Sequence, residues 1–313
     1  MRLTRERLLL LALLAALVAV WWGVWREVSR ATTITFLDVG QGDSILVQAA
    51  SGKTMLVDGG GSQGQEASGY DIGREVVLPA LLARGVRRID ALVVTHPHDD
   101  HVGGLAAVAD QVPVGIVLDP ELESTSEAYA RFREEAEKRK IRAYRATEGQ
   151  RLNLGDGVYV EMLNPPDPRL VGTRSETNDN SVVMRLAEGR VSVLLAADID
   201  RAGAERMARL GEALHSTVLK VPHHGSAQAA VPGFVEAVRP ELAVISVGAR
   251  NQFGHPSDEM LGELERVGAK VMRTDRDGAV TLRLRPPRWW AWGYGGKRRF
   301  EGSVEPVSAR QRR

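Results

Sequence analysis

The residues best suited to chemistry lie in one short segment, residues 95–104, where three of the seven histidines and two aspartates follow the apolar run at residues 91–94. Imidazole and carboxylate groups suit Zn²⁺, Mn²⁺ or Fe²⁺, whereas Ca²⁺ prefers oxygen ligands throughout. A structural zinc site usually has thiolate ligands, and the chain contains no cysteine. The segment therefore predicts a catalytic metal site.

The spacing within this segment predicts how the ligands divide. His96 and His98 follow the predicted strand two residues apart and can converge on one ion, while Asp100 and His101 lie where the next helix begins. We therefore expect two neighbouring divalent ions, Zn²⁺ or Mn²⁺. The competing interpretation is a polar loop whose aspartate caps the helix, but five of six consecutive residues here are of ligand type.

Other candidate ligands follow other apolar runs. Asp198 comes after the run at residues 191–196, where a buried carboxylate needs a cationic partner such as a metal; capping a helix is its alternative role. His223 and His224 follow the run at residues 218–221 and so approach from a third direction. We choose His223 as the ligand and assign His224 a supporting or substrate-contacting role.

Strands and helices must hold these residues together. Short strands bounded by glycine-rich turns open the chain, and strands then alternate with helices, which indicates an α/β protein with a mixed sheet. Strands are expected at residues 33–37, 44–48, 54–57, 91–95, 114–118, 158–162, 181–186, 191–196, 218–221, 242–247, 270–273 and 280–284, and helices at 72–83, 126–140, 201–210, 232–238 and 257–267.

The order of these motifs resembles the metallo-β-lactamase superfamily. The family motif HxHxDH matches His96, His98, Asp100 and His101, with Asp58-Gly59-Gly60 before it and residues 194–198 and 222–226 after it. Within the superfamily the chain is most similar to the extracytoplasmic domain of the ComEC DNA-uptake proteins, through residues 37–44, 178–181, 221–226 and 253–256. The resemblance implies a four-layer αβ/βα sandwich.

The resemblance also implies roles for single residues. Asp198 would bridge the two ions, and Asp100 would serve catalysis as well as metal binding. His255, which precedes Pro256, would donate a proton to the leaving oxygen; a loop or capping histidine is the alternative. The residues expected around the ligands are Asp43, Asp58, Asn180 and His224.

The chain departs from the family pattern at one of the two expected metal ions. Many members carry another histidine ligand before the bridging aspartate, but residues 176–181 contain none. Asparagine there binds metal only weakly through its carbonyl oxygen, so we expect an incomplete protein shell, weaker binding, or Mn²⁺ in place of Zn²⁺. The turn at residues 38–43 is another family marker, which we interpret as a plain hairpin turn except for Asp43.

Composition sets limits on the class of protein. The chain has 313 residues and a formal net charge of +1, so overall charge favours no charged partner. The length suits one large domain, residues 32–285, between two extensions. The absence of cysteine excludes disulfides and a cysteine nucleophile but leaves the compartment open.

The N-terminal extension, residues 1–31, predicts a membrane anchor. Residues 8–25 carry no charge and would span about 27 Å as a helix, close to the thickness of a bilayer. Arg2, Arg5 and Arg7 precede this span and tryptophans crowd its far end, which predicts a cytoplasmic N-terminus and an extracytoplasmic domain at the cell membrane. A cleaved signal peptide is the alternative, but the tryptophans offer no small-residue cleavage site.

The C-terminal extension, residues 286–313, interleaves basic and aromatic residues around Trp289, Trp290 and Trp292. Such a tail suits stacking on single-stranded bases or contact with a membrane surface. Glycine and like charge after Gly295 favour disorder, so we expect a partly disordered tail.

Together these features predict a membrane-anchored, metal-dependent hydrolase that activates water. The resemblance implies a phosphodiester substrate, single-stranded DNA, and partners from an uptake assembly. The same chemistry would serve a lactone, thioester, phosphonate or β-lactam, and a DNA-binding module without catalysis is the non-enzymatic alternative. The intact ligand set favours an enzyme. His215 has no companion residues, and we interpret it as structural.

Overall fold

A computed structural model describes residues 5–29, 31–61, 69–296 and 298–304. The chain divides into two compact units, Met1–Ala31 and Thr32–Arg313. The first unit contains the helix α1 (Arg5–Ser29), which by length and composition is apolar enough to cross a membrane. The arginines Arg2 and Arg30, Lys297 and tail residues 305–313 lie outside the described residues.

Two sheets form the framework of the second unit. Within the described residues, the first sheet has nine strands in the order β16-β15-β14-β1-β2-β3-β4-β5-β6. They are β1 (Thr32–Phe36), β2 (Ile45–Gln48), β3 (Thr54–Val57), β4 (Ile89–Val93), β5 (Val114–Asp119), β6 (Arg142–Arg145), β14 (Val280–Arg285), β15 (Arg288–Gly293) and β16 (Arg299–Ser303).

The second sheet, counted over the same described part of the chain, has seven strands in the order β13-β12-β11-β10-β9-β8-β7. They are β7 (Arg151–Gly155), β8 (Val158–Met162), β9 (Met184–Glu188), β10 (Val191–Leu195), β11 (Val218–Lys220), β12 (Leu242–Ile245) and β13 (Lys270–Arg273). In each sheet a run of parallel strands, β3 to β6 and β10 to β13, adjoins antiparallel neighbours.

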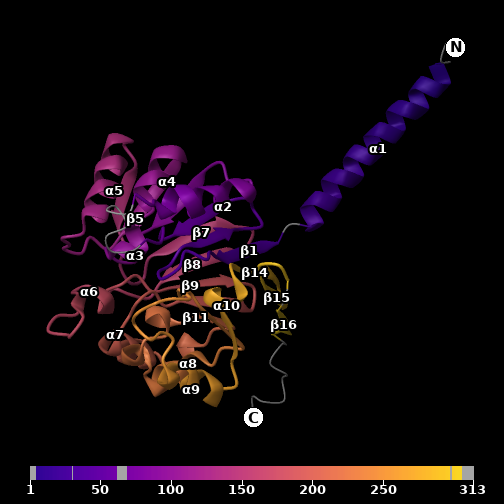
Figure 1. Cartoon of the computed structure of the whole chain (residues 1–313). Coiled ribbons are helices and arrows are strands. Elements are labelled where there is room, and N and C mark those ends of the chain that lie inside the picture. Colours follow the sequence, from indigo (N-terminus) through magenta and orange to yellow (C-terminus); the bar gives the residue numbers. More distant parts are fainter. Residues whose placement is uncertain (1–4, 30, 62–68, 297, 305–313) are drawn as a thin grey trace. The chain divides into compact units, whose positions relative to one another are not determined.

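Helices cover the outer face of each sheet, α2 to α5 on one side and α7 to α9 on the other (Figure 1). Ser126 and Ser257 cap two of them, because their hydroxyls accept hydrogen bonds from the backbone N–H groups of Tyr129 and Met260. The helices are α2 (Leu78–Ala83), which continues a π-helical turn (Gly73–Val77), α3 (Asp99–Val102), α4 (Leu105–Gln111), α5 (Glu127–Lys138), α6 (Glu176–Asp179), α7 (Arg201–Ala208), α8 (Pro232–Val238), α9 (Asp258–Arg266) and α10 (Thr274–Asp277). There are 3₁₀ turns at Gly211–Leu214 and Ala227–Ala229, and a kinked turn at Pro222–Gly225.

Alternation along the strands explains the layers. In β10, Val193 and Leu195 belong to the core between the sheets, whereas Leu194 packs under the helices of its own sheet. Ile45 and Leu46 of β2 divide in the same way between the inter-sheet core and the other helical layer. Successive side chains of a strand point to opposite faces, so strands buried on both faces need continuous apolar runs. The predicted four-layer αβ/βα sandwich is confirmed.

The domain boundary predicted at residue 285 is wrong. Two further strands, β15 and β16, extend the first sheet beyond β14, and the side chain of Trp289 is fully buried in the inter-sheet core. Its Nε1 donates a hydrogen bond to Glu241 Oε2 over 3.1 Å. Apolar burial outweighs the local composition that suggested disorder, so Arg288–Gly293 and Arg299–Ser303 belong to the domain.

Candidate metal centre

The candidate site lies at the carboxyl ends of parallel strands from both sheets. β4 leads to His96 and to α3, β10 leads to Asp198, and β11 leads to His223 and His224. Parallel strands place their carboxyl ends at one edge of a sheet, where ligands commonly bind. The three segments that the sequence predicted to meet do so here.

His101, on α3, is held by a buried carboxylate. Its Nδ1 lies 2.8 Å from Asp58 Oδ2, and Asp58 also accepts hydrogen bonds from the Thr95 backbone N–H (2.8 Å) and hydroxyl (2.6 Å). All three residues are buried. With Nδ1 donating to Asp58, His101 presents the lone pair of Nε2 to the site, as metal-binding histidines usually do. Asp58 thus lies beside the candidate ligand His101, and its supporting role remains a prediction.

His223 and His224 have left-handed backbone conformations, with φ angles of 45° and 54°. Such angles are strained for residues other than glycine and concentrate at functional sites. His224 Nδ1 lies 2.9 Å from the Ser246 carbonyl oxygen, and His223 Nδ1 lies 2.6 Å from Asp200 Oδ1. Both rings therefore keep Nε2 free to face Asp198.

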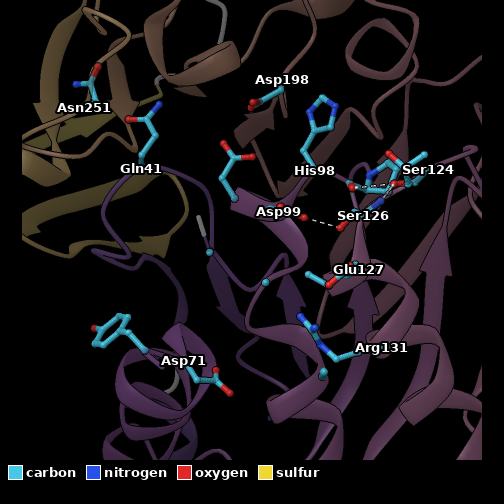
Figure 2. Close-up of a pocket in the computed structure, with 18 of the residues that line it drawn as sticks. Gln41, Asp71, His98, Asp99, Ser124, Ser126, Glu127, Arg131, Asp198 and Asn251 are labelled. Atoms are coloured by element: carbon cyan, nitrogen blue, oxygen red, sulfur yellow. Dashed lines mark hydrogen bonds between the residues drawn. The ribbon is translucent and has the colours of Figure 1, made fainter. Parts of the chain in front are cut away.

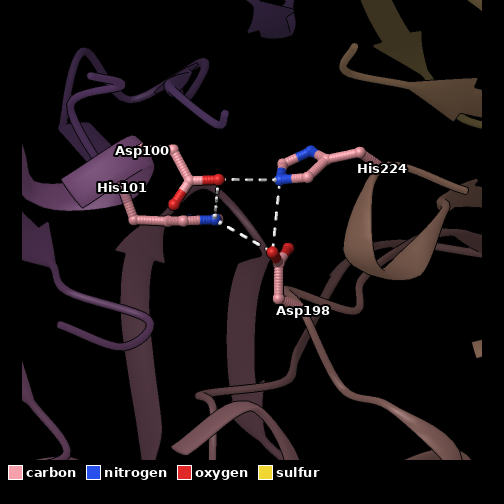
Figure 3. Close-up of side chains that lie close together, drawn as sticks. All are labelled: Asp100, His101, Asp198 and His224. Carbon is pink, nitrogen blue, oxygen red and sulfur yellow. Dashed lines mark ion pairs between the residues drawn. The ribbon is translucent and has the colours of Figure 1, made fainter. Parts of the chain in front are cut away.

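Four side chains form a compact cluster, shown in Figure 3: Asp100, His101, Asp198 and His224. Asp100 is partly exposed, and the other three are buried. The Nε2 atoms of His101 and His224 each lie 3.2 Å from Asp198 Oδ2. His224 Nε2 also lies 3.3 Å from Asp100 Oδ2. His223 is farther away, with Nε2 3.9 Å from Asp198 Oδ2. The cluster therefore contains His224, whereas the sequence favoured His223 as the ligand.

The side chains of this cluster have the chemistry that a divalent cation needs, because buried imidazole nitrogens face two carboxylates. His101 Nε2 and His224 Nε2 are buried and make no hydrogen bond within the described structure. Burial lowers the pKa of His224, yet Asp198 and Asp100 raise that pKa to about 9. Burial likewise opposes the charge of Asp198, but the cationic side chains around it, His224 first, hold its pKa well below the ordinary range. Carboxylates that favour protons on these histidines would equally favour a metal ion in their place.

His96 and His98 form a separate pair beside the cluster. His96 Nε2 lies 3.0 Å from His98 Nδ1, close enough for the two nitrogens to share one ion. Burial, with His101 adjacent, keeps the pKa of His96 well below its ordinary value, and burial also lowers the pKa of His98. Both are therefore neutral imidazoles, the form that binds metals.

Lys220 is a member of the site that we did not predict. Its side chain is fully buried, and its Nζ contacts Asp43 Oδ2, lies 3.4 Å from Asp198 Oδ1 and donates to the Ala197 carbonyl oxygen over 2.9 Å. Burial lowers the pKa of Lys220, but Asp43 and Asp198 more than offset this, so the ammonium stays charged. A lysine within the apolar run at residues 218–221 was the available signal.

The turn at residues 38–43 approaches the site more closely than a plain hairpin would. The backbone N–H of Asp43 donates to the Asp100 carbonyl oxygen over 3.2 Å. Gly42 has a φ of 128°, and a Cβ there would lie 2.1 Å from the same oxygen. Only glycine permits this approach. Asp43 is buried, and its carboxylate contacts Lys220 beside the candidate ligands.

Asn180 does not reach the metal centre. Its amide nitrogen donates to the carbonyl oxygens of Leu170 and Glu176, and its oxygen accepts from the Leu170 N–H, so it holds a loop together. Asn178 lines the groove instead, with a buried Oδ1 atom that accepts no hydrogen bond within the described structure. Asp200, and not Asp198, occupies the N-cap position of α7, although its side chain makes no capping hydrogen bond there.

His255 lies next to the histidine cluster, with its ring centroid 5.6 Å from that of His223. Burial, together with His223 and His224, lowers the pKa of His255 to about 4. A neutral His255 fits a hydrogen-bonding role towards substrate better than that of a charged proton donor. His215 lies apart, beside a shallow hollow lined by Arg151, Tyr159 and Arg185.

The cluster opens into a groove of about 1440 Å³. In Figure 2, Gln41 and Asn251 line one side of it, and Ser124, Ser126 and Arg131 line another. Asp198 and His98 contribute to its lining as well. A pocket for one small ligand usually measures about 300–1,000 Å³, so this groove has room for a larger substrate.

Comparison with known families agrees with this geometry. A family model described as the metallo-beta-lactamase superfamily matches residues 37–249. The matched region contains all the candidate residues except His255. Members of this superfamily are usually metal-dependent hydrolases, so the match implies divalent metal ions without identifying them.

Two curated relatives have names from genetic competence. "ComE operon protein 3" of Bacillus subtilis is 29% identical over 269 residues, and "Competence protein ComA" of Neisseria gonorrhoeae is 32% identical over 252 residues. Each alignment covers 80% of this chain but only 33% and 32% of the relative, so the chain spans about a third of their length. The predicted similarity to competence proteins of the ComEC type is confirmed.

A solved structure, "CmlA, a diiron beta-hydroxylase from Streptomyces venezuelae", has a similar fold. Its TM-score is 0.51 at 17% sequence identity, and the match covers 81% of this chain and 54% of that one. This likeness supports the fold alone, because unrelated chemistries share such scaffolds.

Proposed function

Because the chain belongs to the metallo-beta-lactamase superfamily, we propose that it is a metal-dependent phosphodiesterase that cuts DNA. The observation that carries this proposal is the cluster of Asp100, His101, Asp198 and His224 at the edge of a groove with room for more than a small ligand. A polymer that lies along such a groove can present one internal phosphodiester to the cluster.

The residues of the site have different proposed roles. We assign Asp100, His101, Asp198 and His224 to one divalent ion, and His96 and His98, with Asp198, to a second. Bound ions would lower the pKa of water and stabilise negative charge on the phosphate oxygens. Asp58 orients His101, and Lys220 holds one oxygen of Asp198 so that the other faces the histidines. His223 reaches the groove and would contact the substrate or the second ion.

The substrate class is inferred from the relatives and the groove. Proteins named for competence are similar to this chain, which favours DNA and a role beside uptake proteins. Arg131 and Arg250 line the groove and can contact phosphates. The predicted alternatives, a lactone, thioester, phosphonate or β-lactam, are small by comparison and would leave most of the groove empty.

We also propose that α1 anchors the domain to the cell membrane. In the described part of α1, the side chains of Leu17 and Trp21 are 70% and 72% exposed, a costly arrangement in water. A bilayer would cover them. The arginines before the apolar span then favour a cytoplasmic N-terminus and an extracytoplasmic domain.

The test uses the detergent-solubilised full chain, loaded separately with Mn²⁺ and Zn²⁺. We expect hydrolysis of single-stranded DNA and of bis-p-nitrophenyl phosphate, and none of nitrocefin. Asp198→Asn serves as the inactive control, which removes charge while keeping shape. Binding of DNA without hydrolysis under either metal would instead indicate a DNA-binding module, and hydrolysis of nitrocefin alone would refute the proposed substrate.

A further inference from the structure

We propose that Phe253 is a stacking platform for a base of single-stranded DNA next to the metal centre. The inference rests on the proposed function and specifies how that substrate would be held. Phe253 lines the groove, and its side chain is 62% exposed. An aromatic ring left open to water at the entrance of a site gains most by contact with another flat apolar surface.

The loop that carries Phe253 is held in place by one side chain. Asn251 Nδ2 donates to the carbonyl oxygens of Gly248 (2.9 Å) and His255 (2.8 Å). Its Oδ1 accepts from the backbone N–H groups of Phe253 (3.2 Å) and His255 (3.0 Å). Gln41 joins from another loop, because its Oε1 accepts from the Gly248 N–H. The exposed ring is therefore presented by a fixed turn, which lowers the entropy cost of binding to it.

Phe253 ends a column of rings that begins at the metal centre. Its ring stacks on His255 with centroids 5.6 Å apart and planes 28° apart. His255 stacks in turn on His224 (6.5 Å, 30°), and His224 lies 5.5 Å from His101. One face of Phe253 is thus occupied by His255, and a base on its other face would continue the column. Such a base would belong to a nucleotide that flanks the cleaved bond.

Charges in the groove favour recognition through bases. Arg250 is exposed, lies three residues before Phe253 and makes no ion pair with any described residue, so it suits a phosphate beside the stacked base. The groove also contains Asp71, Asp99 and Glu127, which oppose a polyanion. Phosphate contacts alone would then bind weakly, and stacking must supply part of the affinity. Bases in a duplex already stack on each other, so this platform selects single strands.

The test measures binding without catalysis. A fluorescent oligothymidylate is titrated into the metal-free full chain in detergent at fixed salt, and anisotropy gives the Kd. Stacking of one base on an aromatic ring predicts that Phe253→Ala weakens binding roughly 5- to 150-fold. Phe253→Trp should retain affinity, and Phe253→Leu, which keeps apolar surface but no aromatic face, should lose it. Tyr144→Ala is the matched control, because Tyr144 is 49% exposed but does not line the groove.

An abasic strand of equal length separates stacking from other effects. It should bind wild-type protein as weakly as oligothymidylate binds Phe253→Ala. The platform would be overturned if Phe253→Ala bound oligothymidylate with unchanged affinity, or if the substitution weakened binding of the abasic strand as much as binding of oligothymidylate. If the platform is overturned but wild-type protein still hydrolyses bis-p-nitrophenyl phosphate, the proposed function stands without a base-stacking role for Phe253. If wild-type protein hydrolyses no phosphodiester, the proposed function fails, and the binding series by itself decides whether Phe253 stacks bases.

Discussion

Lys220 Nζ lies 3.4 Å from one carboxylate oxygen of Asp198, while the other oxygen faces His101 and His224 at 3.2 Å each. A buried ammonium thus fixes the carboxylate that the proposed ions would share. A buried ammonium or carboxylate without a partner of opposite charge is costly. Lys220 and Asp198 offset this cost for each other.

Replacing this lysine should destabilise the metal-free protein. Lys220→Met removes the ammonium that pairs with the buried carboxylates of Asp43 and Asp198, and breaking a buried ion pair typically costs about 3–5 kcal/mol. Thermal unfolding with chelator present would show a lower Tm. Lys53→Met, at an exposed lysine, is the control and should change the Tm little. Equal Tm values for the two variants would mean that the buried ion pairs contribute no net stability.

Asp198→Asn should reduce metal content and hydrolysis together, because the amide removes the negative charge shared by His101 and His224. Metal analysis after dialysis and hydrolysis of bis-p-nitrophenyl phosphate would measure both effects. Asp167→Asn, at a surface carboxylate, should alter neither. Two ions per chain with intact activity in Asp198→Asn would exclude the bridging role.

The two adjacent histidines should differ in metal affinity. His224→Ala removes a nitrogen of the four-residue cluster, whereas His223 Nε2 lies farther from Asp198. We expect His224→Ala to weaken metal binding by tenfold or more, and His223→Ala to weaken it less. Calorimetric titration with Mn²⁺ and Zn²⁺ would compare them. A larger loss in His223→Ala would favour the ligand that we chose from the sequence.

Trp289→Ala should destabilise the domain by about 3–5 kcal/mol, as expected for a buried tryptophan. Trp290→Ala, on the opposite face of β15, should cost less. Removing residues 287–313 should then impair hydrolysis of long DNA and of bis-p-nitrophenyl phosphate equally, because the sheet itself is disrupted. If the truncated protein lost activity only on long DNA and kept its Tm, residues 287–313 would instead act as a DNA-binding tail outside the folded domain.

The topology can be tested in cells. Protease added to intact spheroplasts should digest the domain if α1 crosses the membrane with its N-terminus inside. A cytoplasmic protein would serve as the control for lysis. Protection of the domain until lysis would contradict this topology, and a mature chain that begins near residue 30 would indicate a cleaved signal peptide.

Many of the candidate ligands could be proposed from the sequence because they lie close together in it. His96, His98, Asp100 and His101 share one short segment, and such ligand density needs no fold to be noticed. The apolar runs before Asp198 and His223 predicted buried strands, because strands covered on both faces must be apolar throughout. The layered fold followed from that pattern together with the family resemblance.

Other features depended on tertiary structure. Adjacent His223 and His224 look equivalent in sequence, and only the left-handed backbone and the partners of each Nδ1 distinguish them. The partners of Lys220 come from distant segments, so its charge could not be placed beforehand. Strand β6 was not predicted from the sequence, because its residues are exposed throughout and show no apolar alternation.

The C-terminal strands show the same division. Trp289 and Ala291 alternate as in any strand, but glycine and arginine nearby suggested disorder when judged locally. The candidate ligand chemistry could be predicted before the fold was known, because side-chain types and spacing are local properties of the chain. The groups that are buried, paired and aligned could be identified only in the folded protein, because burial and pairing depend on residues that are distant in the chain.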